Sequence, residues 1–135
     1  MAVEHVDAGT LAPPVGYRHA SRSVGLVVVR IAGQVGVDAD GRRVGGDGDY
    51  AAQAEQALDN AMSAFGAAGA GPDDIAELTY YVVDLDEDRA AQVNRGLGRS
   101  VRRHGMPAVP ATMVGITALM HRDLLIEVNG SAVVD

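Results

Sequence analysis

Cysteine and lysine are both absent from this 135-residue chain, and each absence excludes a class of chemistry. Without cysteine there is no thiol nucleophile, disulfide, thiolate zinc site or iron–sulfur cluster. Without lysine there is no Schiff base with a substrate carbonyl or with pyridoxal phosphate. The 11 strongly basic side chains are therefore all arginines, which leaves carboxylates, phenols and histidines as the groups that could transfer protons.

Positive charge is also scarce, because the formal net charge is −7. Nucleic-acid binding requires a basic surface, so we expect no nucleic-acid partner. The one basic cluster ends a predicted helix, where cations favour the helix dipole; it comprises Arg99, Arg102, Arg103 and His104.

Long apolar runs and targeting signals are missing as well. The longest candidate run, residues 26–29, is broken by Arg30 and is far shorter than the roughly 20 residues that cross a bilayer. The first ten residues lack the basic and apolar regions of a signal peptide. We therefore expect a cytoplasmic protein without a membrane partner.

Motifs for metals and cofactors do not occur. The four histidines show neither HxH nor HxxxH spacing, and the glycine-rich segment 41–48 (GRRVGGDG) contains no nucleotide-binding pattern. This segment is predicted to be a loop. We expect no metal and no cofactor.

The periodicity of apolar residues predicts the order ββαβαββ within one domain spanning residues 1–135. Asp49 is a candidate cap for the first helix, and glycines with Pro72 follow its end. The predicted strands are 17–23, 26–32, 78–85, 112–119 and 124–133, and the predicted helices end near residues 68 and 103.

This order indicates an α+β fold in which two helices cover one face of a single mixed sheet. Several strands, notably LVVVRIA (26–32) and DLLIEV (123–128), are nevertheless apolar at consecutive positions, as in strands buried on both faces. The uncovered face therefore requires a partner, and the pattern predicts an oligomer without specifying its symmetry.

Short motifs in the right order along nearly the whole chain resemble the RidA/YjgF family. They are YRHA (17–20), AGQ (32–34), QAEQALDN (53–60), AGA (68–70), YVVD (81–84), VN (93–94), PA (110–111) and IEV (126–128). The resemblance implies a chorismate mutase-like fold and a homotrimer whose uncovered sheet faces pack together, with a small pocket at each subunit interface. It also implies hydrolysis of reactive enamines and imines, such as 2-aminoacrylate, to keto acids and ammonia.

The sequence departs from this family at the arginine that pairs with the substrate carboxylate. In the segment VPATMVGI that position falls on Thr112 or on Ala111, depending on the alignment, and neither can pair with a carboxylate. Ala32 replaces a frequent serine, and Asn129 stands where the family has a second acid. The resemblance thus predicts the fold but not an ordinary 2-aminoacrylate deaminase.

Glu127 occupies the position of the family's water-orienting glutamate and is the candidate general acid/base. The alternative is an exposed or salt-bridged glutamate. The candidate substrate-binding residues are Tyr17, Arg30, Ala32, Gly33, Ala111 and Thr112.

Arg30 interrupts an apolar strand and is a candidate for a relocated substrate-binding cation. The alternatives are an interface ion pair, with Glu127 among its possible partners, or a guanidinium that reaches solvent. Tyr80 and Tyr81 alternate in direction along a strand, so only one of them can line a pocket.

Two hypotheses of function remain. The first is an enzyme that hydrolyses or tautomerises an enamine, an imine or a similar unstable metabolite, with Glu127 as acid/base. The second is a non-catalytic trimer that binds a small molecule or a protein through the same cleft.

Overall fold

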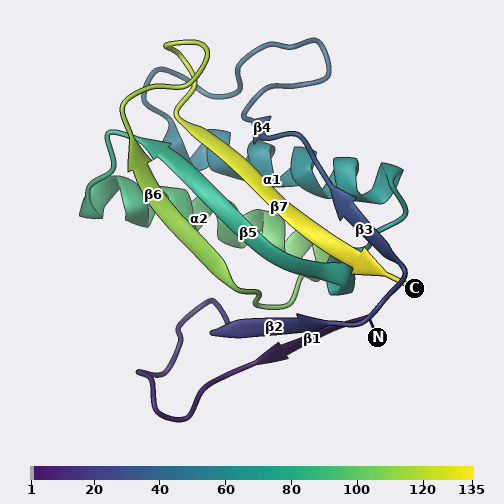
Figure 1. Ribbon diagram of the computed structural model, residues 1–135. Helices are drawn as coiled ribbons and strands as arrows, with labels where there is room; N and C mark the ends of the chain where they lie inside the picture. Colours follow the sequence, from purple (N-terminus) through teal and green to yellow (C-terminus); the bar gives the residue numbers. More distant parts are fainter. Residues whose placement is uncertain (1) are drawn as a thin grey trace.

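Residues 2–135 are described by a computed structural model, in which two long helices pack on one face of a five-stranded sheet (Figure 1). The elements are β1 (Val3–Val6), β2 (Ala20–Ser23), β3 (Val27–Arg30), β4 (Gln34–Val35), α1 (Tyr50–Ala67), the 3₁₀ turn Pro72–Asp74, β5 (Ile75–Val83), α2 (Glu87–His104), β6 (Ala111–Ile116) and β7 (Ile126–Val134).

The main sheet is mixed. Its order is β3-β7-β5-β6, and the short β4 also pairs with β7 beyond the end of β3. β5 and β6 are parallel, as a connection through α2 requires, and the remaining pairs are antiparallel. The predicted α+β fold, with two helices on one face of a mixed sheet, is confirmed.

Side chains alternate strictly between the two faces of the central strands. On β5, Leu78, Tyr80 and Val82 are buried under the helices, whereas Thr79 and Tyr81 point to the other face. The register of β5 and β6 sets Ala111 beside Leu78 and Thr112 beside Thr79. Ala111 and Thr112 consequently lie on opposite faces of the sheet.

The helices begin and end where local signals predict. Asp49 caps α1 by accepting a hydrogen bond from the Ala52 amide at 3.0 Å, and Asp86 caps α2 by accepting from Arg89 at 2.8 Å. α2 stops at Gly105, which adopts the left-handed conformation (φ 61°) common after helix ends. The predicted apolar stripe of α1 is fully or almost fully buried, and it consists of Ala54, Ala57, Leu58, Ala61, Met62 and Phe65.

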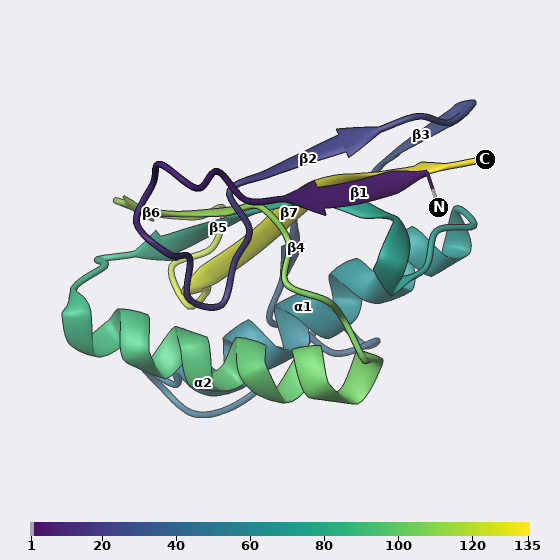
Figure 2. The ribbon, with the colours of Figure 1, turned by 90° about the horizontal axis from the view of Figure 1, so that it is seen from below.

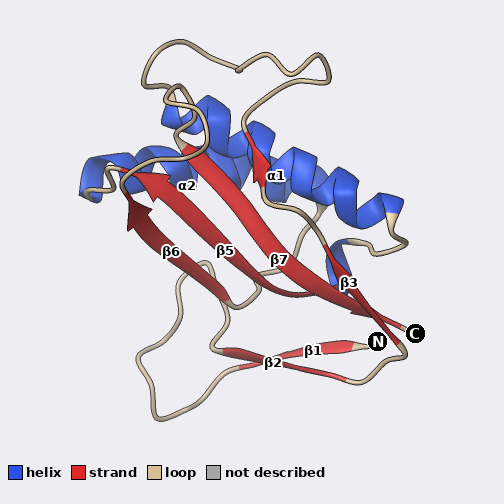
Figure 3. Ribbon diagram, turned by 45° about the horizontal axis from the view of Figure 1, so that its top comes forward, coloured by secondary structure: helices blue, strands red, loops and turns tan. Residues whose placement is uncertain are grey.

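The N-terminal third differs from the prediction of one sheet with two leading strands. The strand expected at 17–23 begins only at Ala20, so Tyr17 lies in a loop. An unpredicted strand, β1, pairs with β2 as a separate two-stranded ribbon (Figure 3). β1 is too short to show a clear period, and it forms only because a strand fourteen residues further along the chain pairs with it.

One face of the sheet carries no helix within residues 2–135. In Figure 2, α1 and α2 lie on one side of the sheet, and the β1–β2 ribbon lies on the other side, near one end of the sheet. Ser21 Oγ ties the ribbon to the sheet by donating a hydrogen bond to the Ala76 carbonyl at 2.7 Å. Val28 and Val114, 52 % and 36 % exposed, belong to the open part of this face, which we call the uncovered face.

Candidate functional site

The residues predicted to form one site are distributed over three separate hollows of the chain. Glu127 and Gly33 line the first, which we call the Glu127 cavity. Ala111 lines the second, which we call the Tyr80 cavity, and Arg30 lines a third, smaller one. Ala32, Tyr17 and Thr112 line none of the three.

The Glu127 cavity, about 660 Å³ in volume, lies where β4 meets β7. Glu127 is half-buried and stands opposite Val35 in the strand register. Gly33 faces the carboxylate so closely that a Cβ built on it would lie 2.6 Å from both Cδ and Oε2 of Glu127. Any side chain at position 33 would therefore displace the carboxylate, which explains why a glycine occurs there.

Arg43 shares this cavity, and sequence reasoning missed it. Its side chain is 27 % exposed and its Nη1 lies 3.0 Å from Oδ1 of Asp47. The loop carrying it folds back through a β-bridge between Val37 and Arg43. No local signal in the glycine-rich segment 41–48 predicted that Arg43 lies in this cavity. Its position depends on the Val37–Arg43 bridge, which forms only because the loop returns toward β4. His121 and Asp123 complete the polar lining.

Arg30 lies elsewhere. It is exposed at the end of β3, opposite Ser131, in a hollow of about 290 Å³ that also includes Glu77 and Asn129. Within residues 2–135 it forms no ion pair, so the hypothetical pair with Glu127 is not present inside one chain. In the same hollow the buried Oδ1 of Asn129 has no hydrogen-bond partner.

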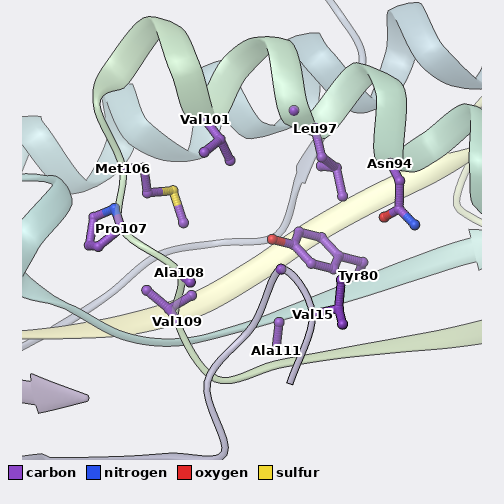
Figure 4. Close-up of a pocket in the computed structure, with 12 residues that line it drawn as sticks. Val15, Tyr80, Asn94, Leu97, Val101, Met106, Pro107, Ala108, Val109 and Ala111 are labelled. Carbon is purple, nitrogen blue, oxygen red and sulfur yellow. The ribbon is translucent and has the colours of Figure 1, made fainter. Parts of the chain in front are cut away.

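The Tyr80 cavity, about 450 Å³, lies between α2, the 106–111 segment and the loop at residues 15–16 (Figure 4). Tyr80 lines it from β5, whereas Tyr81 points to the uncovered face, which settles which of the two phenols can line a pocket inside the chain. Asn94 lines it from α2 and is a second residue that the predicted site omitted. It is part of the VN motif at 93–94, so a signal for it was present.

Tyr17 lies beside this cavity rather than in it. Its neighbours Val15 and Gly16 line the wall, and the Arg18 amide fastens the loop by donating to the Val109 carbonyl at 3.1 Å. The Tyr17 ring is 39 % exposed and packs edge-on against His19, with ring centroids 6.0 Å apart.

One chain does not bring the two main groups of predicted residues together. Gly33 directly precedes β4 and Glu127 is on β7, whereas Ala111 is on β6, with β5 between β7 and β6. Two inter-strand steps of about 4.8 Å separate β7 from β6, and Glu127 and Ala111 also point to opposite faces of the sheet. No group of three or more His, Asp or Glu side chains in residues 2–135 is arranged to hold a metal ion, and no helix there is long and apolar enough to cross a membrane.

Comparison with known proteins identifies the family that this chain resembles. The family model described as "Endoribonuclease L-PSP" matches residues 9–134. The chain is 31 % identical to YyfB of Yersinia pestis, a protein of unknown function in the conserved Rid family, over 99 % of this chain and 100 % of that one, with a TM-score of 0.87. No curated protein matches.

Two further solved structures agree with this assignment. Rv2704 of Mycobacterium tuberculosis, from the YjgF/YER057c/UK114 family, is 31 % identical over 98 % of this chain and 99 % of its own, with a TM-score of 0.61. The YjgF gene product of E. coli is 27 % identical over 96 % and 98 %, with a TM-score of 0.68.

Proposed function

Because the chain belongs to the Rid/YjgF family, we propose that it is a homotrimer with a small-molecule cleft between subunits, in which an enamine or imine is hydrolysed or tautomerised. The observation that carries this proposal is the position of Glu127. Its carboxylate lies in a cavity large enough for a small molecule, against a glycine that leaves it room.

In the proposed reaction Glu127 acts as general acid and then as general base. It protonates the β-carbon of an enamine, which becomes an iminium ion, and the resulting carboxylate takes a proton from water as the water adds to the iminium carbon. Glu127 then transfers that proton to nitrogen, ammonia leaves, and the hydroxyl proton returns to the carboxylate as the ketone forms. The balance is one enamine and one water converted into one ketone and one ammonia.

The substrate we propose is not 2-aminoacrylate. Neither Ala111 nor Thr112 can pair with a carboxylate, and Ala32 provides no hydroxyl. If an anionic group is bound, Arg43 is a better candidate than Arg30, because Arg43 lines the same cavity as Glu127. Its charge is partly offset by Asp47, which favours a weakly anionic or neutral substrate.

A ring of three copies would join the separated halves of the site. In a head-to-tail ring the β6 edge of one copy meets the β4 edge of the next, which would set Ala111 and Asn94 of one copy opposite Glu127 and Gly33 of its neighbour. The separation of these residues within one chain, with Gly33 beside β4, Glu127 on β7 and Ala111 on β6, supports such an assembly.

The second candidate is a trimer that binds a small molecule or a protein without converting it. The absence of the carboxylate-binding arginine and of the hydroxyl at Ala32 favours it, since both groups would otherwise position a reacting substrate. RNA cleavage, which the family description "Endoribonuclease L-PSP" mentions, is not favoured by a net charge of −7.

The substitution Glu127→Gln distinguishes the two candidates. Glutamine keeps the shape but cannot exchange a proton, so ammonia release from a panel of neutral and carboxylated imines should fall by about 10²–10⁴-fold with ligand binding retained. The wild-type protein should release ammonia more slowly from 2-aminoacrylate than from neutral imines.

Glu77→Gln is the matched control, because Glu77 lies on the neighbouring strand outside the Glu127 cavity and should leave turnover unchanged. Unchanged turnover in Glu127→Gln would contradict the catalytic role of Glu127, whereas a wild-type protein that binds these imines but releases no ammonia above the uncatalysed rate would leave the binding candidate. A large fall in melting temperature would show instead that Glu127 is a structural ion-pair partner.

A further inference from the structure

We propose that the Tyr80 cavity is a binding site for a small, uncharged and mostly apolar molecule, whose single hydrogen-bond acceptor is bound by the Tyr80 hydroxyl. A carbonyl oxygen or an imine nitrogen would serve as that acceptor. Ala111 and Asn94 of its lining also belong to the proposed inter-subunit cleft, but the cavity is built from residues of one chain, so ligand binding here requires neither the trimer nor catalysis by Glu127.

The Tyr80 hydroxyl is the polar group in this cavity that lacks a partner. The residue is only 9 % exposed, and Figure 4 shows its hydroxyl directed between α2 and the 106–109 segment. Within residues 2–135 it donates no hydrogen bond. Tyr50 is buried to the same degree, but its hydroxyl donates to the Val83 carbonyl at 2.8 Å. The Tyr80 hydroxyl oxygen is not fully enclosed, so solvent reaches it, and a ligand acceptor would replace water as its partner.

The walls select an uncharged ligand. Leu97 and Val101 contribute from α2, Met106 and Val109 from the following segment, and the exposed Asn94 is the only other polar side chain in the lining. No charged side chain lines the cavity. A carboxylate or ammonium would lose hydration there without gaining a counter-charge, which is costly.

The chemistry of Tyr80 and the size of the cavity agree with this ligand class. Burial raises the pKa of Tyr80 to about 12, so its hydroxyl remains a hydrogen-bond donor at neutral pH. The volume of about 450 Å³ falls within the roughly 300–1,000 Å³ typical of small-molecule pockets. Gly98 helps to keep it open, because a Cβ there would approach only the flexible end of Arg102 within 4 Å.

The test is an NMR titration of the full chain with cyclohexanone, which is neutral with one acceptor, with benzene, which has no carbonyl, and with cyclohexanecarboxylate. Cyclohexanone should shift the amide signals of residues 97–101 and 106–111. Tyr80→Phe should weaken its binding by about 2- to 12-fold, the effect of one hydrogen bond, and should leave benzene binding unchanged. Tyr81→Phe, which removes a hydroxyl from the uncovered face, should change neither.

A second variant tests the location. Gly98→Leu enlarges a residue of the cavity lining at a helix position where a Cβ meets only the end of the Arg102 side chain, and it should abolish the binding of both neutral probes. The proposal is overturned if cyclohexanone binds Tyr80→Phe as tightly as wild type, if Gly98→Leu leaves its affinity unchanged, or if cyclohexanecarboxylate binds more tightly than cyclohexanone.

Discussion

Two glycines in α2 show how far neighbouring residues of one type can differ in their effect. Gly96 faces α1 at a point where the helix backbones approach closely, and a Cβ on it would lie 2.0 Å from the Ala51 carbonyl oxygen. Gly98 faces open space apart from the end of the Arg102 side chain. Sequence reasoning treats both as equal weak points of a helix, whereas the packing makes the first necessary and the second replaceable.

We therefore predict opposite effects of alanine at the two positions. Gly96→Ala should lower the free energy of unfolding by about 1–3 kcal/mol, because the methyl group would push the helices apart. Gly98→Ala should raise it by up to about 1 kcal/mol, because alanine has the higher helix propensity. Urea denaturation of the two variants measures the difference, and equal shifts in the same direction would contradict this packing.

The arginines of the candidate site show which residue-level predictions a sequence allows. Arg30 attracted attention because it breaks an apolar strand, yet it lies in a different hollow from Glu127. Arg43 gave no signal, since it sits in a polar loop whose return path depends on a bridge to Val37. The family resemblance named Glu127 and Gly33, which line one cavity, but it named no residue of the loop that brings Arg43 into the same cavity.

At the scale of elements, the predicted basic cluster at the end of α2 has a more specific role than favouring the helix dipole. Asp59 of α1 accepts hydrogen bonds from Ser100 Oγ at 2.7 Å and from Arg103 at 2.5 Å, and His104 Nε2 lies 2.9 Å away. Glu55, one turn earlier, pairs with Arg99 at 2.8 Å and also with Arg103. The cluster thus joins α2 to α1.

This cluster predicts a pH-dependent stability. Burial acts to raise the pKa of Asp59, but the hydrogen bonds from Ser100 and His104 and the charge of Arg103 outweigh it and lower the pKa below its ordinary value of 3.8. A lowered pKa means that the stabilisation is present above pH 3.8 and is lost as the pH falls through the lowered value.

Asp59→Asn should therefore reduce the free energy of unfolding by about 1–3 kcal/mol at pH 7, and the difference from wild type should shrink below pH 3.8. Denaturation curves at several pH values provide the measurement, with the exposed Asp40→Asn as control. A difference that stays constant down to pH 2 would exclude this role of the carboxylate.

The helices were predictable and the N-terminal strands were not, for a physical reason. The stripe of α1 and the caps Asp49 and Asp86 are local signals, and α1 and α2 begin within one residue of their predicted starts. β1 exists only through its pairing with β2, across a long loop. Pairing between distant segments leaves little trace in a four-residue strand, so the ribbon and the displacement of Tyr17 into a loop were missed.

For the whole molecule, the uncovered face determines the expected assembly. Val28 and Val114 are exposed on it, and the buried Oδ1 of Asn129 has no partner within residues 2–135. Association would bury the apolar side chains. In a trimer of the kind that the family resemblance implies, neighbouring copies would cover this face.

We accordingly predict a trimer of about 42 kDa, three times the chain mass of 14.0 kDa, with no appreciable folded monomer at micromolar concentration. Val114→Glu should dissociate it and lower the melting temperature, because the new carboxylate would be buried in line with Tyr81 and the acidic Glu127, without a counter-charge. Ser63→Glu, on the exposed side of α1, adds the same charge on the helix layer and should leave the mass unchanged. Light scattering coupled to size-exclusion chromatography measures all three proteins. A wild-type mass of 14 kDa would exclude the trimer and the inter-subunit cleft, but not the Tyr80 cavity, which one chain forms alone.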